Sequence, residues 1–101
     1  MPNFITTYDL VETRPDPHET FLEKAMARGW SVWKKGSDGR LYRLPNTTLT
    51  GSFANQDLAV AALKATRADT QRELGVKVSM EKWIVAQYSG SVFASDEKER
   101  P

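Results

Sequence analysis

The stretch FITTYDL, from Phe4 to Leu10, decides how the rest of the chain is arranged. Its aromatic and β-branched residues favour a β-strand, which we place at residues 3–11. Successive side chains of a strand point to opposite faces, and both faces of this run carry apolar residues. We therefore expect an inner strand of a sheet, with the Asp9 carboxylate close to its end.

Length and composition limit the class of protein. The chain has 101 residues, the size of one domain, and its net charge of +1 does not indicate a strongly basic nucleic-acid binder, although a local basic patch stays open. The absence of cysteine excludes disulfides and thiolate metal sites and is compatible with the cytoplasm. We see no apolar run long enough to span a membrane and no signal peptide, so we expect a cytoplasmic protein without a membrane partner.

Two helices are predicted from the residues that typically begin and end helices. The first covers residues 17–28 and the second covers about residues 56–74. The expected N-cap and stop residues are Asp16 and Gly29 for the first helix, and Asn55 and Gly75 for the second.

The remaining patterned segments favour strands. We predict one from Trp30, one over residues 40–53 and one over residues 76–88. The sequence GSDG at residues 36–39 is typical of a turn between the first two. Pro45 should interrupt the strand that contains it, because proline has no amide hydrogen to donate to a neighbouring strand.

The resulting order, β-α-β-β-α-β, is that of the ferredoxin-like α+β fold. Right-handed connections would place both helices on one face of a four-stranded antiparallel sheet. The other face must then be solvated, bound to a ligand or covered by a partner. We assign residues 1–94 to this single domain, and we expect residues 95–101 to form a charged, disordered tail.

Asp9 is the candidate catalytic and metal-binding residue. A carboxylate at the end of a strand can coordinate a hard divalent cation such as Mg²⁺, and a symmetric dimer could bring two copies to one ion. Alternatively, Asp9 caps a loop or pairs with Arg14. Glu12 and Asp16 lie near enough in sequence to form an acidic cluster with Asp9, or else belong to an ordinary polar loop. For His18, the one histidine, we find no orienting acid or nucleophile and expect exposure to solvent.

A second candidate site is the predicted hairpin of residues 30–43, where aromatic and basic residues alternate. Aromatic side chains can stack on bases while neighbouring cations neutralise phosphates, which is what nucleic-acid binding requires. Alternatively, the aromatic residues fill the core or a dimer interface and the lysines keep the hairpin soluble. The residues predicted to contact nucleic acid are Trp33, Lys34, Lys35, Arg40, Tyr42 and Arg43.

The run ITTYDL at residues 5–10, followed by a loop and a helix, resembles the start of the small CRISPR-associated adaptation nucleases and of the virulence-associated protein D toxins. The resemblance implies a homodimer whose sheets pack together, with the acids at the strand ends on the two-fold axis. It also implies metal-dependent cleavage of RNA or DNA phosphodiesters. By that match, Asp9 is the metal-binding acid and Tyr8 is its neighbour.

Three functions follow from these observations. The first is a dimeric nucleic-acid-binding protein that can act as an Mg²⁺-dependent endonuclease. The second is a non-catalytic interaction or regulatory module that self-associates through the open face of its sheet. The third is a sensor that binds a small molecule at the dimer interface.

Overall fold

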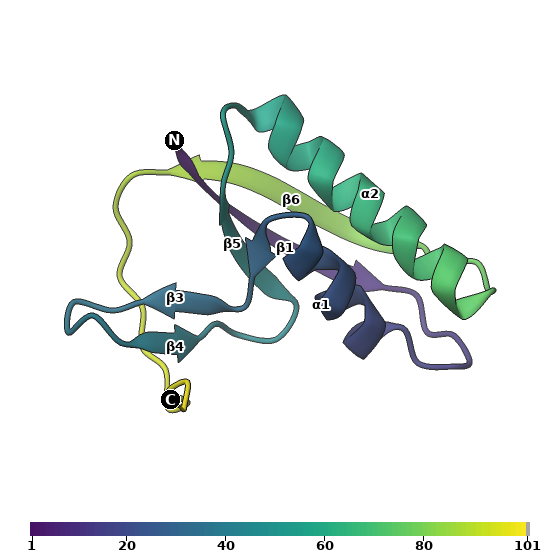
Figure 1. Cartoon of the computed structure of the whole chain (residues 1–101), viewed down its shortest axis with the longest axis horizontal. Coiled ribbons are helices and arrows are strands. Elements are labelled where there is room, and N and C mark those ends of the chain that lie inside the picture. The colour runs from purple at the N-terminus through teal and green to yellow at the C-terminus, as the bar shows by residue number, and fades with distance from the viewer. Residues whose placement is uncertain (101) are drawn as a thin grey trace.

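A computed structural model describes residues 1–100 and contains two α-helices, a four-stranded antiparallel sheet and a separate two-stranded sheet (Figure 1). The α+β class, the four-stranded sheet and the two helices are confirmed. Within the described part of the chain, neither helix is long and apolar enough to cross a membrane. In chain order the elements are β1 (Asn3–Leu10), α1 (His18–Ala27), β2 (Trp30–Ser31), β3 (Trp33–Lys35), β4 (Leu41–Arg43), β5 (Thr48–Ser52), α2 (Gln56–Leu74) and β6 (Met80–Tyr88).

Strand β1 is an inner strand of the sheet, as its sequence predicts. The strands lie side by side in the order β2-β5-β1-β6, and all neighbouring strands are antiparallel. Thr6 in the middle of β1 is paired with Leu49 of β5 and with Val85 of β6, and all three side chains are buried. Residues paired in this way share one face of the sheet, so this row belongs to the core.

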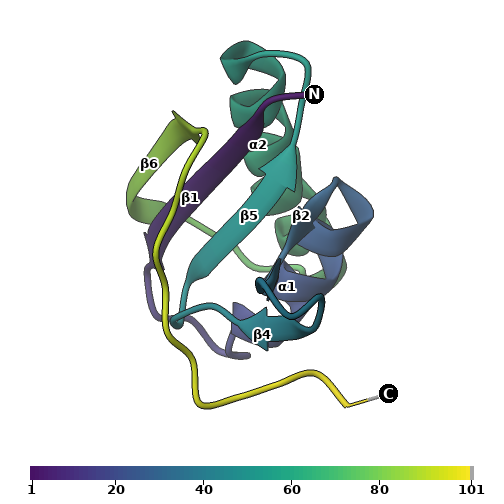
Figure 2. The same cartoon turned by 90° about the vertical axis from the view of Figure 1, so that its left-hand side faces the viewer.

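Both helices cover the same face of the sheet (Figure 1). Their fully buried side chains include Phe21 of α1 and Leu63 of α2, which belong to one core cluster with Phe4 and Tyr8 of β1. The opposite face carries the intervening β1 residues, and Figure 2 shows the C-terminal segment descending along that side of the sheet.

The second helix begins and ends at the predicted residues. The Asn55 side chain accepts a hydrogen bond from the amide of Leu58 at 2.9 Å, and Gly75 ends the helix with a φ of 69°. Glycine suits that left-handed conformation because it has no Cβ. Helix α1 begins at His18 rather than at residue 17, and its N-cap, Pro17, offers no capping side chain.

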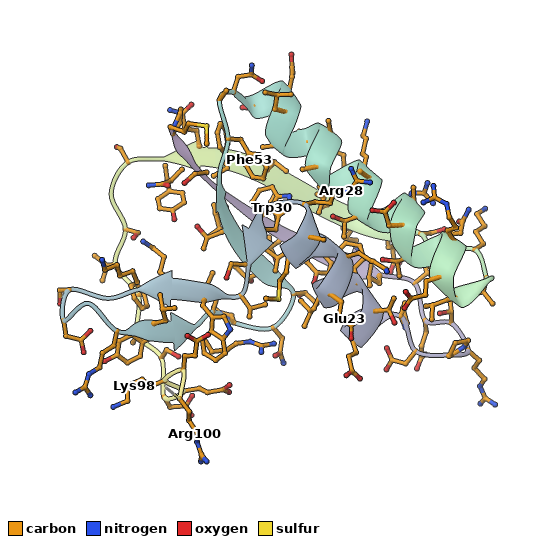
Figure 3. All side chains as sticks on the ribbon, viewed as in Figure 1. Glu23, Arg28, Trp30, Phe53, Lys98 and Arg100 are labelled. Carbon is orange, nitrogen blue, oxygen red and sulfur yellow. The ribbon has the colours of Figure 1, made fainter. Side chains whose placement is uncertain are left out.

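Strand β2 lies against β5 through a close contact at Gly51, which is paired with Trp30. The Trp30 and Phe53 rings lie side by side above this glycine, with centroids 4.8 Å apart (Figure 3). Trp30 is 1% exposed, and its Nε1 is the one buried side-chain polar atom of residues 1–100 without a hydrogen-bond partner.

The predicted second and third strands are each divided in two, which the sequence analysis expected only near Pro45. At the first division, the Ser31 hydroxyl accepts a hydrogen bond from the Trp33 amide and Val32 leaves the sheet. The outer halves, β3 and β4, pair with each other as a separate hairpin that projects beyond the four-stranded sheet (Figure 1). The Leu44 amide donates to the Val32 carbonyl at 2.8 Å and so closes the base of this hairpin.

Strand β6 begins at Met80, later than the predicted residue 76. The residues just before it are held by helix α2 instead of the sheet, because Gln71 accepts a hydrogen bond from the Val78 amide and Arg67 donates one to the Val78 carbonyl.

The C-terminal residues differ from the expected disordered tail. The Arg43 amide donates to the Glu97 carbonyl, and the Glu99 amide donates to the Leu41 carbonyl, both at 2.9 Å. Residues 95–100 therefore lie along β4, where Lys98 and Arg100 project outward (Figure 3). The sequence pattern gives no sign of this pairing, since the segment is short and highly charged. Residue 101 lies outside the described residues.

Candidate functional site

Asp9 lies exposed on the face of the sheet opposite the helices and is paired with Lys82 of β6. It forms no ion pair with Arg14 or any other residue among residues 1–100. The same residues contain no group of three His, Cys, Asp or Glu side chains able to hold a metal, so Glu12 and Asp16 do not form such a group with Asp9. One carboxylate facing a lysine is a poor ligand set for Mg²⁺, and the residues of a single chain do not fit this metal.

The predicted nucleic-acid-binding residues are divided between the two faces of the hairpin. Trp33 is paired with Arg43, whose guanidinium lies 5.9 Å from the centre of the indole ring. Lys34 is paired with Tyr42 on the opposite face. The structure therefore does not gather all the predicted residues into one surface.

On the Lys34 face, the side chains are engaged within the chain. The Lys34 ammonium lies 5.4 Å from the ring centre of Tyr88 and 5.8 Å from that of Phe93. The Tyr42 hydroxyl donates to the Asp38 carboxylate at 2.6 Å. These two residues are therefore less available to a ligand than Trp33, Arg43 and the exposed tip of the hairpin.

Within residues 1–100, the hairpin carries four cations without an ion-pair partner, and one of them, Arg40, lies near the Asp38 carboxylate, which accepts a hydrogen bond from the Arg40 amide. Unpaired cations on a projecting element attract anionic ligands over several ångströms, and salt weakens that attraction. The four are Lys34, Lys35, Arg40 and Arg43.

A pocket of about 430 Å³ lies between the end of β1, the start of α1 and the turn after β4. Its walls combine a guanidinium, an imidazole, a carboxamide and a phenol, and no carboxylate lines it. The lining residues are Tyr8, His18, Leu22, Arg43, Asn46 and Thr47.

Asp16 orients the His18 ring in this pocket. One Asp16 oxygen lies 2.8 Å from His18 Nδ1 and also accepts a hydrogen bond from the His18 amide at 2.9 Å. These hydrogen bonds hold the pKa of the Asp16 carboxyl below its usual value, the amide contributing most. From the sequence, His18 is expected to have no orienting acid, and the structure corrects this because Asp16 bonds to its ring. The sequence feature that could have predicted this contact is an Asp two residues before a His at the start of a helix. Carboxylates at that position commonly accept hydrogen bonds from the first amides of the helix.

Tyr8 closes the inner side of the pocket and is 3% exposed. Its ring packs on Phe21, with centroids 4.6 Å apart. Burial raises the pKa of the Tyr8 phenol from 10.0 to about 12, and the positive charge of Arg43 opposes part of that rise. The phenol is therefore neutral at physiological pH and can donate a hydrogen bond.

Arg43→Gln is expected to raise the pKa of Tyr8 further, because it removes the charge that favours the phenolate. Because the folded pKa exceeds the unfolded value of 10.0, neutral Tyr8 stabilises the fold fully below pH 10.0 and this contribution is lost as the pH rises toward about 12. Alkaline titration of phenolate absorbance measures the shift, and Tyr8→Phe identifies the transition. Lys35→Gln serves as the charge-matched control. An unchanged Tyr8 titration in Arg43→Gln would contradict the proximity of the two side chains.

The turn that forms the outer wall of the pocket is strained. Thr47 has a φ of 56°, a left-handed conformation that β-branched residues rarely adopt. The Thr48 amide donates to the Pro45 carbonyl at 3.2 Å, and the Tyr8 amide donates to the Thr47 carbonyl at 3.1 Å. Such a residue costs about 1–3 kcal/mol, and strain of this kind clusters at binding sites.

Comparison of the chain with protein-family models, with curated proteins and with solved structures finds no match. The features of this chain that bear on function are the hairpin cations, which form no ion pair within residues 1–100, and the polar pocket beside them.

Proposed function

We propose that the protein is a homodimeric nucleic-acid-binding protein of the ferredoxin-like kind. The strand order β2-β5-β1-β6, with α1 connecting β1 to β2 and α2 connecting β5 to β6, supports the fold assignment. The proposal includes a relationship to the small CRISPR-associated adaptation nucleases and the virulence-associated protein D toxins. Its support is the run of residues 5–10. The absence of cysteine fits a cytoplasmic protein.

One observation carries the proposal, namely that the cations of the projecting hairpin form no ion pair within residues 1–100. Lys35 and Arg40 are exposed, and Arg43 lies beside the half-buried Trp33 ring. Cations that can neutralise phosphates next to an aromatic edge suit a flexible, single-stranded nucleic acid.

The affinity for a single-stranded oligonucleotide is expected to fall as salt rises. If Lys35, Arg40 and Arg43 each neutralise one phosphate, the slope of log K against log salt is about −2, since each phosphate of a single strand contributes about −0.7. Lys35→Gln and Arg40→Gln should each make the slope less steep by about 0.7. Fluorescence anisotropy over a range of salt concentrations measures these slopes.

Lys77→Gln is the matched control for this experiment, because it removes one exposed positive charge from outside the hairpin. It should leave the slope unchanged. Binding that is absent at low salt, or that falls equally in Lys77→Gln and Lys35→Gln, would contradict the proposal and favour the interaction module.

Metal-dependent cleavage is a further part of the proposal. Because one chain supplies only Asp9, an Mg²⁺ site would need Asp9 of a second copy. Asp9→Ala is expected to abolish Mg²⁺-dependent cleavage of RNA or DNA while retaining the fold and the binding of nucleic acid. If the wild-type protein cleaves no single- or double-stranded substrate with divalent cations, the proposal of nuclease activity is wrong. The proposal of nucleic-acid binding does not depend on this result.

The exposed part of the sheet face opposite the helices, around Ile84, supports self-association. Ile84 is 59% exposed there and is paired with Thr7, next to the row formed by Ile5 and Ala86. Ile84→Lys should shift the protein toward the monomer, whereas Met26→Lys, on α1, should not. Light scattering at several concentrations measures the mass, and a wild-type monomer at every concentration would exclude the dimer.

A further inference from the structure

We propose that the pocket lined by Tyr8, His18, Arg43 and Asn46 binds a phosphate group. This group belongs either to a mononucleotide or to the 5′ end of a nucleic-acid strand, which present the same chemistry. The pocket shares Arg43 with the proposed nucleic-acid surface, but the proposal does not depend on that surface.

The charge of the pocket favours an anion. Arg43 forms no ion pair with any carboxylate within residues 1–100, and no acidic side chain lines the pocket. The acidic residues Asp16 and Glu97 contact pocket residues: Asp16 is engaged with Nδ1 of His18, and Glu97 accepts a hydrogen bond from the Arg43 amide through its backbone carbonyl. A guanidinium without a carboxylate partner at the wall of a polar pocket is well suited to bind phosphate oxygens through paired hydrogen bonds.

The other polar groups can complete the site. With Nδ1 of His18 bonded to the Asp16 carboxylate, Nε2 is the ring nitrogen left for a ligand, and it donates to a phosphate oxygen when the ring carries both protons. Asn46 offers a carboxamide that can donate through its NH₂ group, and the Tyr8 hydroxyl is a donor in its neutral form. A phosphate group has several acceptor oxygens, so it can bond to three or four such donors at once.

The shape of the pocket indicates a ligand larger than an isolated ion. Its volume of about 430 Å³ falls within the range of small-molecule sites, about 300–1,000 Å³. Leu22 supplies an apolar wall beside the polar groups, as a nucleoside attached to the phosphate would require. The strained turn at Thr47 holds the neighbouring Asn46 in place, since Tyr8 of β1 bonds to the Thr47 carbonyl.

Titration with inorganic phosphate and with adenosine 5′-monophosphate, followed by two-dimensional NMR, tests the proposal. Both ligands are expected to saturate and to shift the signals of His18, Asn46 and Thr47. Arg43→Gln should weaken binding at least about tenfold, the usual effect of losing a charged hydrogen bond, and His18→Gln should weaken it several-fold. Lys77→Gln, which removes an exposed cation outside both the hairpin and the pocket, should bind as the wild type does. Circular dichroism checks that each variant is folded.

Three results would overturn the proposal. They are the absence of saturation by both ligands, equal weakening in Arg43→Gln and Lys77→Gln, and binding of adenosine as tight as that of its monophosphate. Oligonucleotides with and without a 5′ phosphate distinguish the two sources of the phosphate group. Tighter binding of the phosphorylated strand assigns the pocket to strand ends, and equal affinity for both strands assigns it to mononucleotides. If the protein binds phosphate but no oligonucleotide, only the proposed function is contradicted. If it binds oligonucleotides but not phosphate, only this inference is contradicted.

Discussion

Phe21→Ala is expected to lower the free energy of unfolding by about 3–5 kcal/mol, the usual effect of removing a buried phenylalanine from a core. Phe21 is fully buried in α1, and its ring packs on Tyr8 at a centroid distance of 4.6 Å. The substitution leaves a cavity beneath the pocket and lets water approach the phenol. The pKa of Tyr8 should therefore fall from about 12 toward 10.0, its value in water.

Urea denaturation and alkaline titration of the same variant measure both effects. Met26→Ala is the matched control, because it truncates a large apolar side chain on the same helix where that side chain is 56% exposed. It should change the free energy of unfolding by less than about 0.5 kcal/mol, as most surface substitutions do. Equal destabilisation by the two substitutions would contradict the packing of α1 on β1.

Gly51→Ala is expected to destabilise the protein by about 3 kcal/mol, at the upper end of the usual cost of overpacking. A methyl group at this position would lie 2.6 Å from the Gly29 carbonyl oxygen and 2.7 Å from the Phe53 ring. Because one of these contacts is to backbone, the strain cannot be relieved by a side-chain rotation alone. Strand β2, paired with β5 only through residues 30 and 31, should therefore separate from the sheet first.

Gly90→Ala provides the comparison, because no atom lies within 4 Å of the added methyl group. It should leave the denaturation midpoint close to that of the wild type. Hydrogen exchange adds a second measurement, since amides of β2 and β5 should lose protection in Gly51→Ala while those of α2 keep theirs. If Gly51→Ala were as stable as Gly90→Ala, the close approach of β2 to β5 would be wrong.

Helix α2 could be predicted to the residue because its ends are determined locally. Asn55 bonds to an amide three residues later, and Gly75 adopts a φ that other residues avoid. Both effects involve only neighbouring residues, so the sequence contains the whole cause. Strand β1 was predictable because its aromatic and β-branched residues favour a strand. Its buried face consists of Phe4, Thr6, Tyr8 and Leu10.

The division of the strand from Trp30 could not be predicted. Residues 30–35 are similarly suited to a strand throughout, and the break depends on a hydrogen bond from the Trp33 amide to Ser31 and on a distant bond from Leu44 to Val32. The late start of β6 has the same origin, because long side chains of α2 bond to Val78. Interactions between distant segments decide these boundaries.

The sequence predicted that basic and aromatic residues would form the candidate site. It could not predict which of these residues lie together and are free to contact a ligand. Arg43 and Trp33 were identified from the alternation of basic and aromatic residues, whereas Lys34 and Tyr42 are engaged within the chain. His18 was set aside for want of an orienting acid, although Asp16 lies two residues away. The pocket brings together residues near positions 8, 18 and 45, and only the tertiary structure places these side by side.

The pairing of the C-terminal residues with β4 also affects solubility. The outer edge of β4 would otherwise present free backbone donors and acceptors, the template on which strands of other molecules add and aggregates grow. The segment around Lys98 occupies that edge, and its many charges oppose the addition of a further strand. A chain ending at Ala94 would lose this protection, and the outer edge of β4 would then be open to strand addition by other copies.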